Sequence, residues 1–432
     1  MRVALVNPRW RYENSIYFGC REPHLPLELG YAKALLEADG HETILLDGQL
    51  QHLPNEVLAE HVAAFRPEMT VVTTAPTYLF WRCAPPELRT PAEFLAELGR
   101  RGGTTVAAGP HGSATPGATL RKLGCDVVVR GECEDVVRAL AAAGGDAGGV
   151  AGTARLERGA PVLEGPPAAT AFEDVPPLAW PDGLLRSHDH HHHRFDGGRW
   201  GGPGAEVEAS RGCPYACTFC AKIDYRDKYR RRKIEHVLAE IDGLVAQGVA
   251  YVYFVDEIFL PQRPLLEALA ERDVRIGVQT RIDLWSEDMI ALLGKAGCVS
   301  VEAGVESLSV EGRAALEKRC RMDNDALADR LALARRHIPF VQANLIATPQ
   351  DDPAVVALWR ERLREAGVWA NDPVPLFPYP SSPAYRSLFG SPDDEAWERA
   401  HAWYLGRFGR FSDIEDERPA ALPELEAACR TA

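Results

Sequence analysis

Short apolar runs alternate with segments of helical periodicity over the first 145 residues. Residues 3–6 form such a run, and Leu27, Tyr31 and Leu35 recur on one helix face before Gly40 ends that helix. Buried parallel strands are short and continuously apolar, so the alternation predicts a parallel sheet with helices packed on it. The expected strands are residues 2–7, 42–46, 70–74, 104–107 and 125–129. This pattern predicts an α/β, doubly wound, Rossmann-like domain over residues 1–145.

The pattern changes between residues 146 and 205, where glycine, proline and alanine dominate. A hairpin is expected at residues 153–163, and four histidines occupy residues 190–193. Consecutive histidines do not easily converge on one ion, and this turn-forming composition is typical of connections between domains. We therefore expect residues 146–205 to be a linker.

From residue 206 the alternation of strands and helices resumes. The expected strands are residues 206–210, 251–255, 274–280, 299–303, 340–347 and a sixth near 368–376. Six β/α units are too few for an eight-fold barrel of ~250 residues. The pattern therefore predicts a partial (β/α)6 barrel over residues 206–380. Residues 381–432 are expected to form a helical tail that carries Trp397, Trp403 and Tyr404.

The charge balance of the chain limits its partners. Among 432 residues, 62 Asp and Glu against 48 Lys and Arg leave a formal net charge of −14. An acidic surface disfavours non-specific nucleic-acid binding, which requires basic side chains. No apolar run reaches the ~18 residues of a membrane span, and the N-terminus resembles a strand more than a signal peptide. We expect a cytoplasmic protein with neither nucleic acid nor membrane as a partner.

Three of the ten cysteines lie within eight positions, at Cys213, Cys217 and Cys220. They follow the first strand of the predicted barrel, at the end where barrel enzymes place their active sites. Three thiolates on one loop can bind three irons of a four-iron cluster and leave the fourth iron open to a small molecule. A zinc site would need a fourth ligand, for which residues 188–193 are the dense local source. A chance grouping in a turn is the third interpretation.

Residues 211–220 resemble the signature of the radical S-adenosylmethionine (SAM) superfamily, including the aromatic residue before the last cysteine. The first half resembles the cobalamin-binding domain that one large branch of this superfamily carries. That second resemblance depends on residues 25–31, 40–41, 108–111 and 129–132, taken in this order. The two resemblances cover about residues 1–145 and 206–350. They imply a [4Fe–4S] cluster, SAM and cobalamin as cofactors.

The superfamily resemblance also implies roles for strand-end residues of the barrel. The three cysteines would bind the cluster, and Phe219 would lie beside the adenine of SAM unless it is a packed core ring. Glu257, with Asp256 as the runner-up, would accept hydrogen bonds from the SAM ammonium group. The other expected SAM contacts are Arg281, Glu306 and Ser307. An ion pair between Arg281 and Asp283 is the competing interpretation of that arginine.

Ligands of doubly wound sheets lie outside the carboxyl ends of the strands. The residues that the resemblance places near cobalamin there are Asn7, Thr73, Thr74, Gly109, His111, Gly131 and Glu132. The hexapeptide Asp-x-His-x-x-Gly, whose histidine binds cobalt in other cobalamin proteins, is absent. His111 as a cobalt ligand is the alternative, but we expect it beside the corrin or its tail. A nicotinamide cofactor is disfavoured because no Gly-x-Gly-x-x-Gly follows the first strand.

The combination of the two domains implies an enzyme that methylates an unactivated carbon of a small molecule, such as a sugar or a natural-product intermediate. Methylcobalamin would supply the methyl group, and a 5′-deoxyadenosyl radical would abstract hydrogen from the substrate. One alternative is a rearrangement or cyclisation without methyl transfer. A second is a non-catalytic zinc- or cobalamin-binding protein. An external electron donor resembling flavodoxin or ferredoxin is expected as a partner.

Aromatic residues near and beyond the sixth strand could line a pocket for this substrate. They are Trp359, Trp369, Phe377, Tyr379 and Tyr385. More of them are expected in the core than in a pocket. Tyr225, Arg226 and Tyr229 follow the cysteines and could also face the substrate.

Overall fold

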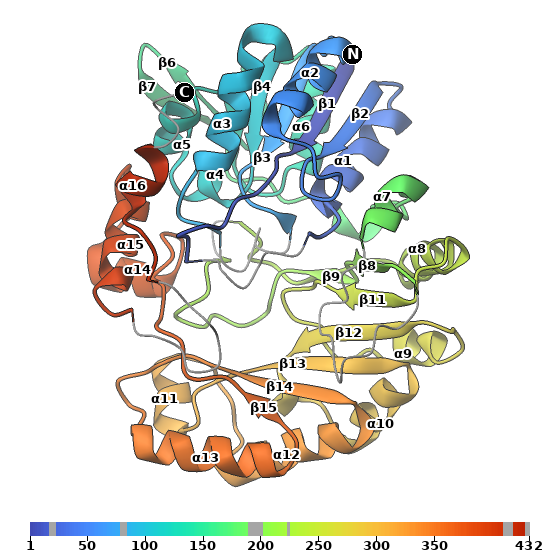
Figure 1. Ribbon diagram of the computed structural model, residues 1–432, viewed down its shortest axis with the longest axis vertical. Coiled ribbons are helices and arrows are strands. Elements are labelled where there is room, and N and C mark those ends of the chain that lie inside the picture. Colours follow the sequence, from blue (N-terminus) through green and yellow to red (C-terminus); the bar gives the residue numbers. More distant parts are fainter. Residues whose placement is uncertain (17–22, 78–83, 189–201, 223–224, 409–417, 428–432) are drawn as a thin grey trace.

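The computed structural model describes residues 1–16, 23–77, 84–188, 202–222, 225–408 and 418–427. Two α/β units lie one above the other, and the C-terminal helices lie beside both (Figure 1). The histidine run at residues 190–193 falls outside the described residues. Within these ranges, no helix combines the length and the apolar character that crossing a membrane requires.

The first unit is built on a seven-stranded sheet with the order β2-β1-β3-β4-β5-β6-β7. Its strands are β1 (Arg2–Asn7), β2 (Glu42–Asp47), β3 (Met69–Thr73), β4 (Thr104–Ala108), β5 (Val127–Val129), β6 (Thr153–Glu157) and β7 (Ala160–Glu164). Strands β1 to β5 are parallel, as predicted. The hairpin β6–β7 pairs antiparallel with β5. The sheet thus extends past residue 145, into the segment expected to be a linker.

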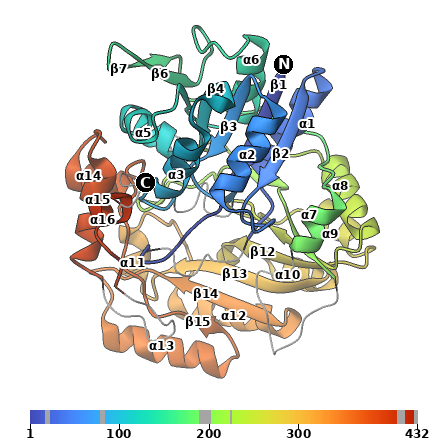
Figure 2. The ribbon, with the colours of Figure 1, turned by 45° about the horizontal axis from the view of Figure 1, so that its top comes forward.

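Helices cover both faces of this sheet (Figure 2). On one face lie α1 (Leu27–Ala38) and α6 (Glu134–Ala142), on the other α2 (Asn55–Phe65), α3 (Arg89–Leu98) and α5 (Pro116–Leu123). The first pair buries Leu36 and Val137 against the strands. The other three bury Leu58, Phe94 and Leu120. Two apolar layers around one parallel sheet confirm the doubly wound fold.

The second unit is a six-stranded parallel sheet with the order β15-β14-β13-β12-β11-β8. Its strands are β8 (Gly204–Val207), β11 (Tyr251–Phe254), β12 (Arg275–Thr280), β13 (Cys298–Glu306), β14 (Phe340–Leu345) and β15 (Trp369–Ala370). The main helices between them are α8 (Ile234–Ala246), α9 (Arg263–Leu269), α10 (Glu287–Lys295), α12 (Asn324–His337) and α13 (Pro353–Glu365). Spatial order follows chain order, which confirms the partial barrel.

One hydrophobic core extends from the barrel into the first unit. Phe172, Leu178 and Trp180, from the segment expected to be a linker, pack in the same cluster as the barrel strands. Tyr31 of α1 belongs to that cluster too. Because burial of apolar area stabilises contacts throughout the chain, this continuous core fixes the first unit on the barrel.

The tail contains α14 (Pro383–Phe389), α15 (Ala396–Leu405) and α16 (Leu422–Ala427). Trp397 and Tyr404 of α15 share a core with Trp10, which follows β1, and with Phe377, which follows β15. The tail therefore connects the loops at the carboxyl ends of both sheets, and it lies beside the region where the two units meet (Figure 2).

Candidate active site between the two units

A cavity of about 440 Å³ lies at the carboxyl ends of the barrel strands. All three candidate cluster ligands line it, namely Cys213, Cys217 and Cys220. Four barrel strands or the loops after them contribute Glu257, Gln279, Arg281, Glu306 and Ile346. Ile16 of the first unit and Tyr404 of α15 also line the cavity. The structure thus brings the predicted cluster site and most of the predicted SAM contacts together between the units.

The cysteine loop follows β9 (Ser210–Arg211), which pairs with β10 (Arg230–Arg231). Gly212 begins the loop with φ +75°, and a Cβ atom there would lie 2.1 Å from the carbonyl oxygen of Lys228. Only glycine fits this close approach. Burial raises the pKa of the Cys220 thiol to about 12. A bound metal centre would therefore be needed to hold it as a thiolate.

The geometry of the site differs from that of a single-ion zinc centre. Among the described residues, no three His, Cys, Asp or Glu side chains converge on one ion position. A four-iron cluster does not require such convergence, because each thiolate binds a different iron. The Nε2 atom of His188 lies 2.9 Å from the carboxylate of Glu206 in the core. The described residues around the cysteine loop thus do not form the convergent ligand set of a single zinc ion.

The two acidic residues after β11 have different surroundings. The carboxylate of Asp256 accepts hydrogen bonds from the backbone N–H of Ala209, at 2.9 Å, and from the hydroxyl of Ser210. Glu257 lines the cavity and accepts a 2.9 Å hydrogen bond from the backbone N–H of Gly212. Burial raises the pKa of both carboxyl groups. A carboxylate facing the cavity suits an ammonium ligand, which supports Glu257 over Asp256.

Arg281 makes the ion pair with Asp283 that was considered for it and also lines the cavity. Its Nη2 donates a 2.7 Å hydrogen bond to Asp283, and its Nη1 donates a 2.6 Å bond to the carbonyl oxygen of Lys318. Its guanidinium carbon lies 4.0 Å from the ring centre of Tyr215. The ion pair holds the guanidinium in place and leaves it beside the cavity.

Two neighbouring residues at the end of β13 were predicted to face SAM, and only the first of them lines the cavity. Glu306, with φ +65°, lines the cavity and accepts a 2.6 Å hydrogen bond from Lys318. Ser307 does not line it and donates a 2.7 Å hydrogen bond to Asp351. Phe219 lines the cavity. Lys318 was missed by the sequence analysis because it lies in a loop without a motif.

Two of the predicted cobalamin contacts, Asn7 and Thr73, are buried in a polar cluster at the ends of β1 and β3. The amide of Asn7 donates a 2.8 Å hydrogen bond to Asp47. Its oxygen accepts bonds from Thr73, at 2.9 Å, and from the indole of Trp10, at 2.7 Å. These side chains hold the strand ends and the loop after β1 that carries Trp10.

His111, at the start of α4 (Pro110–Ala114), uses both ring nitrogens inside the protein. Nδ1 lies 3.1 Å from the hydroxyl of Thr74, and Nε2 lies 2.8 Å from the carbonyl oxygen of Pro85. Its ring lies 4.5 Å from the indole of Trp397. Burial lowers the pKa of His111 to about 3, so the ring is neutral. Both ring nitrogens of His111 therefore have partners within the protein.

Among the remaining cobalamin candidates, Gly131 and Glu132 lie beside the segment that connects the units. Gly109, with φ +146°, precedes α4. Gly131, with φ +86°, pairs with Ala168, whose carbonyl oxygen would lie 2.1 Å from a Cβ atom. Glu132 is buried, and it pairs with Arg211 at 3.4 Å and with Arg230. The carboxylate of Glu132 is therefore engaged in a contact with the barrel unit.

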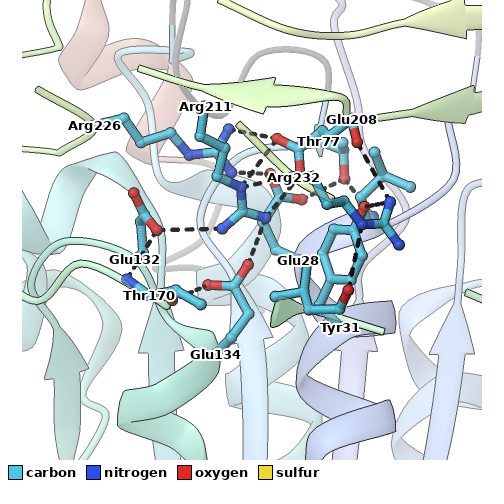
Figure 3. A network of polar contacts seen from close by, with 12 residues as sticks. Glu28, Tyr31, Thr77, Glu132, Glu134, Thr170, Glu208, Arg211, Arg226 and Arg232 are labelled. Carbon is cyan, nitrogen blue, oxygen red and sulfur yellow. Dashed lines mark hydrogen bonds and ion pairs between the residues drawn. The ribbon is translucent and has the colours of Figure 1, made fainter. Parts of the chain in front are cut away.

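A buried network of charges connects the first unit to the cysteine loop (Figure 3). Arg211 reaches Glu134 at 2.6 Å and Glu208 at 2.7 Å. Arg226 pairs with Glu28 of α1 at 3.2 Å and with the site residue Glu257 at 3.2 Å. Arg226 was considered for a substrate contact, but its side chain is buried among carboxylates. No sequence motif indicated the network, since its partners come from separate segments.

The predicted aromatic residues fall into two groups. Phe377 and Tyr379 line the cavity, and Trp369 lines a second cavity next to it. Tyr385 is fully buried, and Trp359 packs against the barrel core. The first group supports the expectation of an aromatic pocket wall.

Comparison with known families agrees with this architecture. The family model "Radical SAM superfamily" matches residues 207–355, and "B12 binding domain" matches residues 20–141. The chain therefore combines a B12-binding domain with a radical SAM domain, as the resemblance implied. This combination implies SAM, a [4Fe–4S] cluster and cobalamin as its cofactors.

Three relatives show how far the similarity extends. An uncharacterized methyltransferase of Pyrococcus horikoshii is 25% identical over 72% of this chain and 66% of its own length. The anaerobic magnesium-protoporphyrin IX monomethyl ester cyclase of Rubrivivax gelatinosus is 26% identical over 71% of this chain and 56% of its own length. This chain thus matches less than two thirds of either protein. The solved structure of the radical SAM methyltransferase TsrM from Kitasatospora setae, with cobalamin and a [4Fe–4S] cluster, matches this chain with a TM-score of 0.71 and 20% identity. The match covers 89% of this chain and 76% of TsrM.

Proposed function

We propose that the protein is a cobalamin-dependent radical SAM enzyme that methylates an unactivated carbon of a small molecule, such as a sugar or a natural-product intermediate. The observation that supports this most directly is the cavity between the units. It is lined by three cysteines and by strand-end polar residues, and both units and the tail contribute to it. The similarity to a methyltransferase and to TsrM, which has also been solved with its tryptophan substrate, supports methyl transfer to a small molecule.

The residues of the cavity suit these cofactors. When bound, the cluster and cobalamin supply one-electron cleavage of SAM and a methyl carrier. Glu257 would accept hydrogen bonds from the SAM ammonium group, and Arg281 would bind its carboxylate through the planar guanidinium. Phe377 and Tyr379 would exclude water from the reacting atoms.

A rearrangement or cyclisation without methyl transfer is the alternative. The similarity to an anaerobic cyclase supports it. The mass of the product distinguishes the two, because methylation adds one CH₂ to the substrate and a rearrangement adds none. With deuterated methyl-SAM, only methylation transfers the label.

The first experiment measures iron, sulfide, zinc and cobalamin in anaerobically reconstituted protein. We expect about four irons and one cobalamin per chain, and a reduced-cluster electron paramagnetic resonance (EPR) spectrum that changes when SAM is added. Cys217→Ala should lose the cluster, whereas the control Cys125→Ala should keep it, because Cys125 lies in the core of the first unit. Stoichiometric zinc without iron would refute the proposal in favour of a non-catalytic protein.

The proposed chemistry also suggests a donor and a compartment. Such a cluster needs a one-electron donor, and a flavodoxin- or ferredoxin-like protein would serve. The seven cysteines among the described residues are free thiols, which supports a reducing compartment such as the cytoplasm. Turnover with reduced flavodoxin as the electron source tests the donor.

A further inference from the structure

The inner face of the barrel sheet carries polar side chains where closed barrels hold mainly Val, Ile and Leu. The hydroxyl of Tyr253 on β11 donates a 3.2 Å hydrogen bond to Glu302 on β13. The amide of Asn344 on β14 donates to the same carboxylate at 3.3 Å, and the amide of Gln342 donates to Asn344. Polar groups in an interior cost free energy unless they have partners, and these side chains partner one another. The ladder thus gives the inside of the barrel a polar lining.

Gln342 and Asn344 of this ladder line a second cavity of about 350 Å³, which we name the inner chamber. Its residues that do not line the cysteine cavity are Gln342, Asn344, Leu345, Trp369, Asn371 and Asp372. Phe219, Gln279 and Glu306 line both cavities, so a ligand in the chamber would lie next to the cysteine site. The volume falls within the ~300–1,000 Å³ of small-molecule sites.

The chemistry of the inner chamber selects a class of ligand. Oε1 of Gln279 is buried and has no hydrogen-bond partner within the described part of the chain, so it offers an acceptor. The amides of Gln342 and Asn344 can each donate and accept. Among described residues, no Lys, Arg or His lines the chamber, which disfavours an anion. Its carboxylates, Glu306 and Asp372, already pair with Lys318 and Arg360.

We propose that the inner chamber binds the substrate, and that this substrate is a polyhydroxylated small molecule, uncharged or bearing an amine, as in a sugar. Hydroxyl groups both donate and accept hydrogen bonds, as the amides of the chamber do. Trp369 presents an apolar ring face to the C–H groups of such a molecule. This inference depends on the proposed function and names the substrate class of that site.

The test uses the holoenzyme with SAM and four probes: D-glucose, D-glucosamine, D-glucose 6-phosphate and indole. Saturation-transfer NMR titrations report their binding, and equilibrium dialysis reports SAM affinity. We expect both unphosphorylated sugars to bind at least tenfold more tightly than the phosphate. Gln342→Leu/Asn344→Leu should weaken them at least tenfold, because two amide partners are lost. The control Gln247→Leu removes amide hydrogen bonds to Trp180 and Asp182 outside the chamber, so it should leave sugar affinity unchanged.

Binding of indole in preference to the sugars would overturn the assignment, and this comparison needs only the wild-type protein. Sugar affinity that is unchanged in the double variant would overturn it too. SAM affinity should stay within twofold in the double variant, and a tenfold loss would assign the chamber to SAM instead. A wild-type enzyme that binds the sugars but never cleaves SAM would contradict the proposed function and leave the sugar site standing.

Discussion

Arg211 is the residue whose replacement best tests the buried charge network. Its side chain is fully buried and contacts Glu132, Glu134 and Glu208, while its guanidinium lies 4.4 Å from the ring of Phe172. Arg211→Met keeps much of the packing and removes the charge. Because Glu132 retains Arg230 and Glu208 retains Arg226, the main uncompensated charge is that of Glu134.

Breaking a buried ion pair on one side costs about 3–5 kcal/mol, and we expect that loss for Arg211→Met at pH 7. Urea unfolding of the apo-protein, followed by tryptophan fluorescence, measures it. Arg211→Met/Glu134→Leu removes both charges and should recover at least half of the loss, since an apolar pair leaves no buried charge. A single variant that loses less than about 1 kcal/mol of unfolding free energy would refute the role of Arg211 in balancing the buried charge of Glu134. A double variant that regains none of the lost stability would refute it too.

The pH dependence of this loss has a definite sign. Burial raises the pKa of Glu134, but the charge of Arg211 outweighs it and holds that pKa below the ordinary 4.5. The pair therefore contributes stability above pH 4.5 that disappears as the pH falls below it. The difference between wild type and Arg211→Met should shrink from pH 7 to pH 4, because Glu134 is then neutral in the variant. A difference that is constant over this range would contradict an electrostatic origin.

Three further predictions concern the site and the first unit. Glu257→Gln should weaken SAM binding about 10- to 100-fold in an EPR titration, whereas Asp256→Asn should not, because only Glu257 lines the cavity. Gly212→Ala should abolish iron incorporation, since its Cβ would clash with a backbone oxygen, while Gly243→Ala in α8, with no atom within 4 Å, should keep full iron content. His111 has a pKa of about 3 in the fold and an ordinary value of 6.5, so wild type should lose stability as the pH falls through this interval. His111→Phe should flatten that slope in pH-dependent urea unfolding.

Local periodicity predicted both sheets because a strand's apolar run and a helix's repeat are visible within ten or fifteen residues. All eleven strands overlap the predicted ranges, but β8 begins two residues before its predicted range and β15 spans only Trp369–Ala370 of the expected 368–376. The hairpin β6–β7 was also expected, but its pairing with β5 was not. That pairing depends on backbone contacts between segments that carry no shared pattern.

For some candidate site residues the sequence predicted a place on the cavity that the structure shows, and for others it did not. The cysteine spacing predicted Cys213, the resemblance to the radical SAM superfamily implied Glu257 and Arg281, and the structure places all three on one cavity. Ser307 follows Glu306 directly in the sequence, yet only Glu306 lines that cavity. Which of two neighbours faces inward depends on the backbone at the strand end, where Glu306 has φ +65°.

The sequence by itself determined the order of the elements, the two α/β units and the loop that carries three cysteines, because these depend on neighbours along the chain. Only the tertiary structure decided that Glu132 pairs with Arg211, 79 residues away, and that Glu28 pairs with Arg226, 198 residues away. It also decided that polar side chains of separate strands enclose the inner chamber. Such contacts arise from packing between distant segments, and no local pattern of hydrophobic and polar positions records them.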